Sequence, residues 1–422
     1  MPNPVPEEQR QFAVDVVRRL RDAGFEAYWA GGCVRDQLLG RTPKDYDVAT
    51  NALPPEIRQL FGHRRTLAVG AAFGVITVLG PRNAGQIEVA TFRRDAAYSD
   101  GRHPDSVTFS TAREDASRRD FTINGLFYDP AGEEVIDFVG GREDLGRRVI
   151  RAIGNPRERF GEDKLRMLRA VRFSATFQFT LEADTLAAIQ QMAEQITVVS
   201  PERIAMEMHR MLIERNRSTA VGLLLQTGLA AVVLPEIVPA DHAAQRRWDH
   251  ALTVLERLDE PGFPLALAAL LYPVVDPGGA QQVCRRWRLS NHQTDRVAWL
   301  VEHHAALEHA RSTRWSKLQR LLIAEGIEDL LALGEAMALA GDGDTSQLAW
   351  CRARLAEPRE VLDPPPLVTG DDLIRHGVAA GPEYGVLLGR VRDAQLDEEV
   401  HTKTDALALV DRLLEEGARD EG

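Results

Sequence analysis

Cysteine is scarce in this sequence, and the few cysteines lie far apart. Only three occur in 422 residues, at Cys33, Cys284 and Cys351. None of them belongs to a Cys-x-x-Cys pair, the spacing typical of structural zinc sites. The sequence therefore predicts neither a zinc site nor a disulfide framework.

Long apolar runs are also missing. No uninterrupted apolar segment approaches the length needed to span a bilayer. Residues 1–10 are polar and contain proline and glutamate, without the basic start and apolar core of a secretory signal. We therefore expect a cytoplasmic protein that does not act at a membrane.

Lysine is nearly absent, so arginine carries almost all of the positive charge. The four lysines are Lys44, Lys164, Lys317 and Lys403. A base-composition bias of the source genome explains this preference, and we draw no functional conclusion from it. The net charge of −12 argues against electrostatic binding of nucleic acid along the whole chain, but it is compatible with a local basic site.

The order of the expected elements predicts an α+β protein. Residues 66–69, 74–79 and 86–92 are rich in Val, Ile and Thr and are separated by Gly, Pro and Asn, as strands are. From about residue 150 the strand pattern ends, and Leu- and Ala-rich helical segments continue almost to the end of the chain. We expect a mixed sheet with a few helices, followed by an all-helical part.

A glycine pair follows the first expected strand, residues 27–30. Gly31 and Gly32 permit a tight turn with exposed backbone N–H groups. A short helix over residues 34–39 should follow, closed by Gly40. A strand, a glycine turn and a helix N-terminus together form an anion site, for which a triphosphate is a natural occupant.

Two aspartates come next. In a strand over residues 45–50, Asp45 and Asp47 would point to the same face. Two adjacent carboxylates repel each other unless a cation lies between them, and hard oxygen ligands suit Mg²⁺. Two exposed aspartates after a glycine turn are the alternative. With the glycine pair and an arginine upstream, we favour metal-assisted nucleotidyl transfer.

Glu88 lies in an apolar strand, residues 87–91. A carboxylate in the middle of such a strand is costly unless it has a partner. Either Glu88 faces outward from an edge strand, or it is a third carboxylate beside Asp45 and Asp47.

A polar segment, residues 93–112, has little periodicity and is expected to be a mobile loop that closes over substrate. Arg118 and Arg119 follow it. They could reach phosphate while Asp120 ties them to the protein. A surface charge cluster is the alternative.

Residues 161–173 predict one strong helix in which Asp163, Arg166, Arg169 and Arg172 step by three. Each member of the series lags the last by about 60°. Asp163 and Arg166 should therefore be near neighbours, whereas Arg172 should lie almost on the opposite side. An ion pair with solvated arginines is the structural alternative.

These motifs, in this order, resemble the bacterial-type (class II) tRNA nucleotidyltransferase and poly(A) polymerase family. The likeness is close over roughly residues 25–215. The segments that carry it are residues 31–36, 45–47, 87–93, 118–124 and 162–173. No single segment is specific, but the combination is.

The resemblance implies a domain order. It begins with a polymerase-beta-like nucleotidyltransferase head at residues 1–150 and a helical neck with a base-recognition helix at 151–215. A helical body at 216–360, similar to a degenerate HD domain, and a tRNA-binding helical tail at 361–422 complete the chain. The HD resemblance breaks down at Tyr272 and Pro273, which stand where a metal-binding His-Asp pair is needed. We therefore predict no phosphohydrolase activity.

The resemblance also implies roles for residues of the head. Asp45 and Asp47 would bind Mg²⁺, and Glu88 would complete the catalytic carboxylates of a two-metal mechanism. Gly32 and Arg35 would hold the triphosphate.

On the same resemblance, Arg119 would assist in holding the triphosphate. Asp163 and Arg166 would read the exocyclic amine and adjacent ring nitrogen of C or A and reject U and G. Arg169 and Arg172 would bind phosphate or serve as scaffold.

The implied reaction is template-independent addition of CCA to tRNA 3′ ends from CTP and ATP, with release of pyrophosphate. Residues 69–76, 98–105 and 370–374 look more like the CCA-adding branch than the poly(A) polymerase branch. Poly(A) synthesis and a restricted CC-adding or A-adding activity are the alternatives. A non-catalytic RNA-binding protein on the same scaffold is a further one, against which the intact acidic residues argue.

Overall fold

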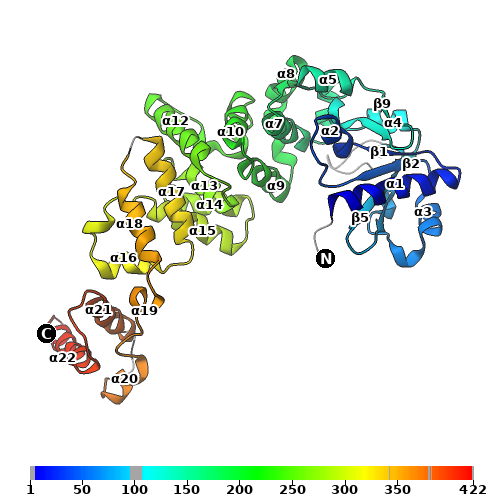
Figure 1. Cartoon of the computed structure of the whole chain (residues 1–422). Coiled ribbons are helices and arrows are strands. Elements are labelled where there is room, and N and C mark those ends of the chain that lie inside the picture. Colours follow the sequence, from blue (N-terminus) through cyan, green and yellow to red (C-terminus); the bar gives the residue numbers. More distant parts are fainter. Residues whose placement is uncertain (1–4, 96–106, 342, 379–380, 382, 421–422) are drawn as a thin grey trace. The chain divides into compact units, whose positions relative to one another are not determined.

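The structure is a computed structural model that describes residues 5–95, 107–341, 343–378, 381 and 383–420. It forms two compact units (Figure 1). The first comprises Met1–Val238 with Arg286–Leu289, and the second comprises Pro239–Arg285 with Ser290–Gly422. The division at Val238 lies inside the predicted body. The four-part division into head, neck, body and tail stays a prediction.

A mixed seven-stranded sheet is the centre of the first unit. Its strand order is β3-β4-β5-β2-β1-β8-β9. Only β2 and β5 run parallel, and the other neighbours are antiparallel. The strands are β1 (Ala27–Ala30), β2 (Asp47–Thr50), β3 (Thr66–Leu67), β4 (Val75–Leu79), β5 (Gln86–Thr91), β8 (Leu126–Asp129) and β9 (Glu134–Asp137). The predicted α+β class and mixed sheet are confirmed.

The alternation of side chains along β5 determines the face of the sheet on which the Glu88 carboxylate lies. Ile87 and Val89 are fully buried, while Glu88 between them is exposed. This period of two puts the apolar residues on the core face and Glu88 on the other. Because β5 lies between β4 and β2, the interpretation of Glu88 as part of an edge strand is wrong.

Two small ribbons accompany the sheet. One pairs β6 (Arg93–Asp95) with β7 (Val107–Phe109), and the other pairs β10 (Val149–Ile150) with β11 (Thr180–Leu181). The prediction of a mobile loop over residues 93–112 is therefore wrong at both ends. The first residues form β6, and the last ones form β7 and the start of α4. Its middle, residues 96–106, lies outside the described residues.

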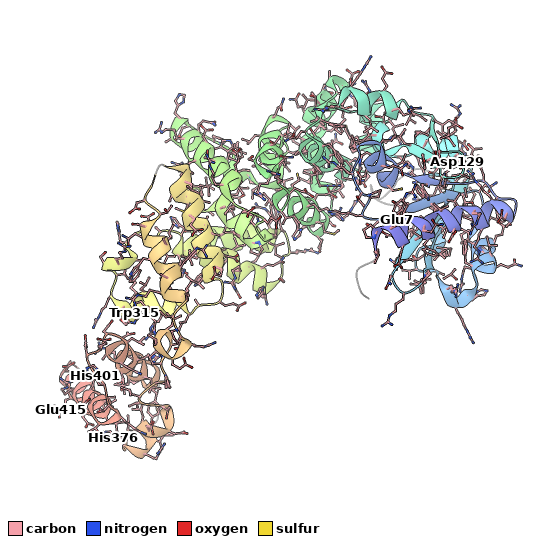
Figure 2. All side chains as sticks on the ribbon, in the orientation of Figure 1. Glu7, Asp129, Trp315, His376, His401 and Glu415 are labelled. Atoms are coloured by element: carbon pink, nitrogen blue, oxygen red, sulfur yellow. The ribbon has the colours of Figure 1, made fainter. Side chains whose placement is uncertain are left out.

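Helices α1 and α3 pack on strands of the sheet, and α2 packs against β1 and β8 (Figure 1). Asp129 of β8, labelled in Figure 2, binds the Arg21 guanidinium of α1 at 2.6 Å. The helices of the first unit are α1 (Pro6–Asp22), α2 (Gly32–Leu38), α3 (Pro54–Phe61), α4 (Ala112–Ser117), α5 (Gly141–Arg147), α6 (Pro156–Glu162), α7 (Leu165–Phe177), α8 (Ala183–Met192), α9 (Pro201–Leu212), α10 (Arg217–Gln226) and α11 (Ala230–Val233). Short 3₁₀ turns occur at His63–Arg65, Ala71–Phe73, Thr122–Asn124, Ala193–Val198 and Pro235–Ile237.

The second unit has helices and no strand in the residues that the structure describes. Its most apolar helix is α13, in which all residues but Pro264 are buried, and α12 and α15 pack against it. The helices are α12 (His242–Arg257), α13 (Phe263–Leu271), α14 (Pro277–Arg286), α15 (Asn291–His303), α16 (Trp315–Leu322), α17 (Ile327–Ala340), α18 (Ser346–Leu355), α19 (Arg359–Leu362), α20 (Gly370–Arg375), α21 (Tyr384–Leu396) and α22 (Lys403–Asp420). A 3₁₀ turn follows α15 at Ala310–Ser312. Within the described ranges, every helix is too short or too polar to cross a bilayer.

Candidate active site

The glycine turn joins β1 to α2. Gly31 has a φ of 74°, a conformation that glycine adopts without strain. A Cβ atom at Gly31 would lie 2.7 Å from Nη1 of Arg119, closer than side-chain atoms approach one another. The turn therefore requires glycine because of its backbone angle, and a larger residue would also displace the Arg119 guanidinium that packs against it.

A cavity of about 540 Å³ opens beside this turn. Seven arginines and three aspartates contribute to its wall, so the site is locally basic in a chain with a net charge of −12. The lining residues are Gly31, Gly32, Arg35, Asp47, Arg118, Arg119, Asp120, Asn124, Asp163, Leu165, Arg166, Arg169, Arg172, Phe173 and Arg203. A basic, open cavity of this kind suits a polyanionic ligand such as a nucleoside triphosphate.

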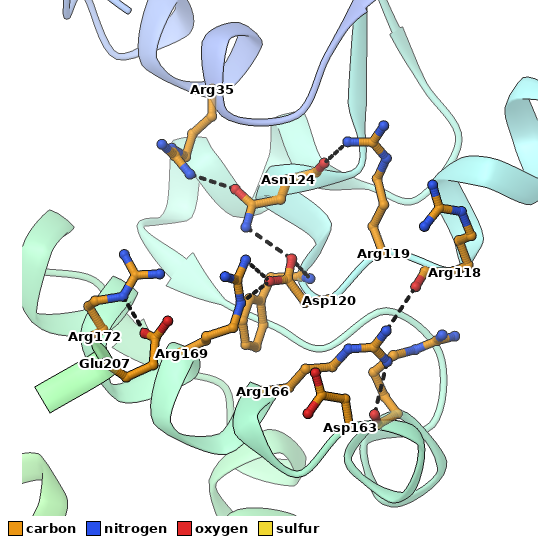
Figure 3. Close-up of polar contacts among 12 residues, drawn as sticks. Arg35, Arg118, Arg119, Asp120, Asn124, Asp163, Arg166, Arg169, Arg172 and Glu207 are labelled. Atoms are coloured by element: carbon orange, nitrogen blue, oxygen red, sulfur yellow. Dashed lines mark hydrogen bonds and ion pairs between the residues drawn. The ribbon is translucent and has the colours of Figure 1, made fainter. Parts of the chain in front are cut away.

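Asn124 connects three of the charged residues (Figure 3). Its Oδ1 accepts a hydrogen bond from Nη1 of Arg35 at 2.6 Å, and its Nδ2 donates to Asp120 at 3.0 Å. Its backbone carbonyl accepts from Nη1 of Arg119 at 3.3 Å. We found no sign of this connecting role in the sequence, because the three partners lie at unrelated distances along the chain.

Arg118 and Arg119 are held by Asp115, and the expectation that Asp120 would hold them is wrong. The two Asp115 oxygens accept from Arg118 at 2.7 Å and from Arg119 at 3.0 Å. Burial alone would raise the pKa of Asp115, but the two guanidinium groups lower it below its ordinary value. Asp115 lies three and four residues before the arginines, a spacing at which helical side chains meet, so the sequence did contain a signal for this pairing.

Asp120 holds Arg169 instead. Both Nε and Nη2 of Arg169 donate to its Oδ2, at 2.9 and 2.6 Å (Figure 3). Burial opposes ionisation of Asp120, but Arg169 and the Asn124 amide outweigh it and lower the pKa to about 2. This ion pair, whose carboxylate is buried, connects α7 to the segment that follows α4.

The depressed pKa of Asp120 predicts a pH-dependent stability. A carboxyl whose pKa falls on folding stabilises the protein above its ordinary pKa of 3.8 and loses that contribution as the pH falls through about 2. The free energy of unfolding of the native sequence should therefore drop by about 2 kcal/mol more than that of Asp120→Asn between pH 4 and pH 2. Urea unfolding at both pH values measures this difference. Asp22→Asn, at the exposed end of α1, should behave as the native sequence does, and parallel curves for all three proteins would refute the assignment.

The predicted helix over residues 161–173 is broken. Helix α6 ends at Glu162 and α7 begins at Leu165, with Asp163 between them in an extended conformation (φ −144°, ψ 106°). The spacing had predicted that Asp163 and Arg166 share one helical face. Because the helix is broken, they do not. Both nevertheless line the cavity, because the break turns the Asp163 carboxylate toward it.

Asp163 and Arg166 each have another partner. Asp163 Oδ2 accepts from Nη2 of Arg203 on α9 at 2.7 Å. Arg166 donates to Glu162 at 2.5 Å and to the Arg118 carbonyl at 3.2 Å. The structural alternative of an Asp163–Arg166 ion pair is thus wrong. Arg203 is a residue of the site that the sequence did not reveal, because its partner lies 40 positions away.

Arg172 is also held in the cavity, and the expectation that it lies almost on the opposite side from Asp163 is wrong. All four residues of the series line one cavity. The Nε of Arg172 donates to Glu207 of α9 at 2.6 Å (Figure 3), and Glu207 is only 2 % exposed. The chain turn at Asp163 and the long arginine side chains account for the difference from an ideal helix.

The contact between Arg203 and Asp163 predicts a positioning role. Arg203→Ala would leave the Asp163 carboxylate without this partner, so it would no longer be held in one orientation. For CTP and ATP, the substrates that the resemblance implies, we expect KM to rise about tenfold, the equivalent of one charge-assisted hydrogen bond, with a smaller change in kcat. Steady-state incorporation assays give both constants. Arg203→Lys keeps the charge and should recover part of the loss, whereas unchanged KM values for both substrates would contradict the role.

The three acidic residues of the predicted metal site lie on strands β2 and β5 or just before β2. Asp47 begins β2 and is the Cα partner of Glu88 on the neighbouring parallel strand β5. Asp45 precedes the strand, so the predicted strand over residues 45–50 is two residues too long at its start. Of the three, Asp47 lines the cavity, and all three are exposed to solvent.

Electrostatics couple these carboxylates. Desolvation in the dense wall of the cavity, together with Glu88 and Asp45, raises the pKa of Asp47 to about 6, although Arg119 works against this rise. The Asp47 carboxylate reaches the open cavity and yet has many protein atoms around it. A cation bound beside it would remove the repulsion among the three carboxylates.

These residues fit Mg²⁺ in one binding mode. Among the described residues, no three His, Cys, Asp or Glu side chains are grouped closely enough to hold a metal ion by themselves. Mg²⁺ in phosphoryl-transfer sites is bound through one or two carboxylates, with waters and substrate phosphates as the other ligands. Asp47, with Glu88 and Asp45 nearby and a basic cavity beside it, matches that donor set.

Family profiles match three parts of the chain. The profile of the "Poly A polymerase head domain" matches residues 27–151. The "Probable RNA and SrmB- binding site of polymerase A" matches residues 178–240, and domain 2 of the tRNA nucleotidyltransferases matches residues 264–410.

Curated relatives match nearly the full length. A CCA-adding enzyme from Lactiplantibacillus plantarum is 33 % identical over 408 residues, covering 94 % of this chain and 94 % of the relative. A CCA-adding enzyme from Geobacillus kaustophilus is 36 % identical over 403 residues, covering 94 % and 95 %. Among solved structures, the Bacillus stearothermophilus CCA-adding enzyme in complex with CTP superimposes with a TM-score of 0.77 at 30 % identity, covering 97 % of this chain and 99 % of that one.

Proposed function

The chain belongs to the family of CCA-adding enzymes, and from that premise we propose how its own residues carry out the reaction. The enzyme is a CCA tRNA nucleotidyltransferase, which adds cytidine and adenosine to tRNA 3′ ends without a nucleic-acid template. CTP and ATP are its substrates, and pyrophosphate leaves. Since its substrate is tRNA, we propose that it acts in the cytoplasm.

The observation that carries the mechanism is the composition of one cavity. Gly32, Asp47 and Arg166 come from a glycine turn, a strand and a helix, and all three line it. One bound nucleotide could thus reach three groups: the anion site at Gly32, the Asp47 carboxylate for a cation, and the Arg166 guanidinium for the base.

We assign the phosphates to the basic wall. The N–H groups of the turn at Gly32 and the guanidinium of Arg119, packed against Gly31, would bind the triphosphate. Arg35 is fixed by Asn124 and Asp36. It still has N–H groups that none of these bonds uses, since guanidinium carries five.

Arg169 and Arg172 would contribute further positive charge. Each is anchored by a buried carboxylate, Asp120 or Glu207, which orients it before substrate arrives. Prior orientation lowers the entropic cost of binding a phosphate.

Asp163 and Arg166 would read the base. A carboxylate accepts from the exocyclic amine of cytosine or adenine, and an arginine donates to the adjacent ring nitrogen. Uracil and guanine present the reverse pattern on that edge, so they would leave buried polar groups unpaired. The protein itself would then serve as the template.

Asp45, Asp47 and Glu88 would act at the reacting atoms. Enzymes of this family generally use divalent metal ions, and we propose Mg²⁺ in a two-metal arrangement held by Asp45 and Asp47, with Glu88 completing the acidic set. When bound, the ions supply activation of the RNA 3′-hydroxyl and charge stabilisation for the departing pyrophosphate.

An incorporation assay tests the proposed function. The full chain, Mg²⁺ and tRNA lacking its 3′ CCA are incubated with labelled CTP or labelled ATP, and then with both. We expect two cytidines followed by one adenosine. Use of only one nucleotide would identify a restricted enzyme, and long A tails on unstructured RNA would identify a poly(A) polymerase. Incorporation of neither label would refute the proposal.

A further inference from the structure

A second cavity, also of about 540 Å³, lies within the second unit. Its walls come from α12, the end of α15 with the segment that follows it, α17 and the start of α18. A cavity of this size is large enough to enclose a small organic ligand. Nothing in the reaction of the first unit makes use of it.

The charge of this cavity is opposite to that of the first. Glu308 and Asp344 contribute carboxylates, and no arginine or lysine is among its described lining residues. Bound polyanions such as nucleoside triphosphates would be repelled here. The cavity therefore suits a ligand without phosphates that offers hydrogen-bond donors.

Three histidines, His250, His304 and His309, form part of the wall, and the first two pack on Tyr272. The ring centroids are 6.3 Å apart for His250 and 5.0 Å apart for His304. In the described part of the chain, the Tyr272 hydroxyl is buried and has no hydrogen-bond partner. It therefore makes no hydrogen bond to a ring nitrogen of His250 or His304. The Nδ1 of His304 lies 2.8 Å from the Val301 carbonyl, which can only accept. Nδ1 therefore carries a proton, and Nε2 of His304 is left for a ligand.

Other polar groups of the wall complement this imidazole. Oε1 of Gln347 already accepts from the backbone N–H of Arg311 at 3.0 Å, so the amide NH₂ of Gln347 is the group left as a donor. Glu308 supplies acceptors. Met337 and Leu348 supply apolar contact surface of the kind on which flat rings pack. Acceptors, one donor and apolar surface are thus combined in one cavity.

We propose that this second cavity binds an unphosphorylated nucleoside with an amine-bearing base, of the adenosine or cytidine type. Such a base presents an exocyclic NH₂ donor next to a ring-nitrogen acceptor. Glu308 accepts from the amine, Gln347 donates to the ring nitrogen, and the base lies against Met337 and Leu348. This would be a binding site separate from the polymerising cavity of the first unit.

Equilibrium dialysis of labelled adenosine against the full chain tests the site. The measurement is made in an Arg166→Ala background, which weakens base binding in the first unit. We expect saturable binding of one adenosine per chain and at least tenfold weaker binding of uridine, which lacks the exocyclic amine. Glu308→Gln should weaken adenosine binding at least tenfold. Its matched control, Glu302→Gln at an exposed position of α15, should leave the affinity unchanged.

A second variant blocks the cavity by volume. Ala338→Phe places a ring in the space, and circular dichroism shows whether the variant is folded. Folded Ala338→Phe should lose adenosine binding in the Arg166→Ala background, and the same substitution in the otherwise native chain should still allow addition of nucleotides to tRNA. Absence of saturable adenosine binding, equal binding by Glu308→Gln and Glu302→Gln, or binding that persists in folded Ala338→Phe would each overturn the proposal. So would saturable binding of spermidine that adenosine does not displace.

Discussion

Asp47→Ala is expected to reduce incorporation of both CTP and ATP about a thousandfold, because charge stabilisation by a bound metal is worth several kcal/mol of transition-state energy. Of Asp45, Asp47 and Glu88, Asp47 is the one that lines the cavity, and Glu88 lies directly beside it on the neighbouring strand. Loss of its carboxylate removes the ligand that joins the cation to the triphosphate site. Single-turnover incorporation at saturating nucleotide measures the chemical step.

The fold should survive this substitution. The Asp47 side chain reaches solvent at the cavity, and its carboxylate repels Glu88 and Asp45 in the absence of a cation. Removing it should therefore leave the thermal unfolding midpoint unchanged or raise it. Asp22→Ala, at the exposed end of α1, is the matched control and should retain full activity. Activity of Asp47→Ala within a factor of about three of the control would contradict the metal assignment, since one tenfold step corresponds to only 1.4 kcal/mol.

The sequence predicted the sheet of the first unit well because local patterns specify it. Alternating apolar residues located β4 and β5 within one residue at each end, and the glycine pair located the turn before α2. Asp45 was placed in the strand wrongly, because alternation alone does not show where backbone pairing begins. The ribbon of β6 and β7 was missed for the same reason. Its two strands lie on either side of a polar segment, and no alternation pattern shows that they pair.

The segment over residues 161–173 shows a different limit. Residues 161–173 have an uninterrupted helical pattern, yet the chain leaves the helix at Asp163. The Asp163 carboxylate accepts from the backbone N–H of Leu165 at 3.0 Å, which starts a new helix after a break. Aspartate often makes such local bonds. The regular three-residue spacing of Asp163 and the arginines nevertheless favoured the prediction of one unbroken helix.

Contacts that cross between helices could not be predicted at all. Arg203 and Glu207 of α9 hold Asp163 and Arg172, and Asp120 holds Arg169 across 49 positions. Each of these pairs depends on how helices pack, which one sequence does not encode in any local pattern. The motifs thus identified Asp163, Arg169 and Arg172, whereas the partners Arg203 and Glu207 became visible only in three dimensions.

Asp163→Ala is expected to lower incorporation of CTP and ATP about a hundredfold, since a hydrogen bond to a charged group contributes about 1.5–3 kcal/mol and its loss leaves the base amine unpaired. The loss should be larger than that of Arg203→Ala, because Asp163 would itself touch the base while Arg203 acts through it. Incorporation of each nucleotide in separate reactions measures both effects.

Asp163→Asn separates recognition from simple loss of contact. A carboxylate only accepts, so it rejects uracil, which presents a carbonyl oxygen where cytosine has an amine. The amide of asparagine can rotate and donate to that oxygen, while it keeps the size of aspartate. Asp163→Asn should therefore raise the ratio of UTP to CTP incorporation about tenfold, although Arg166 still faces the N3–H of uracil, whereas Asp163→Ala should not raise this ratio. If the ratio in Asp163→Asn equals that of the native sequence, Asp163 does not read the exocyclic group of the base.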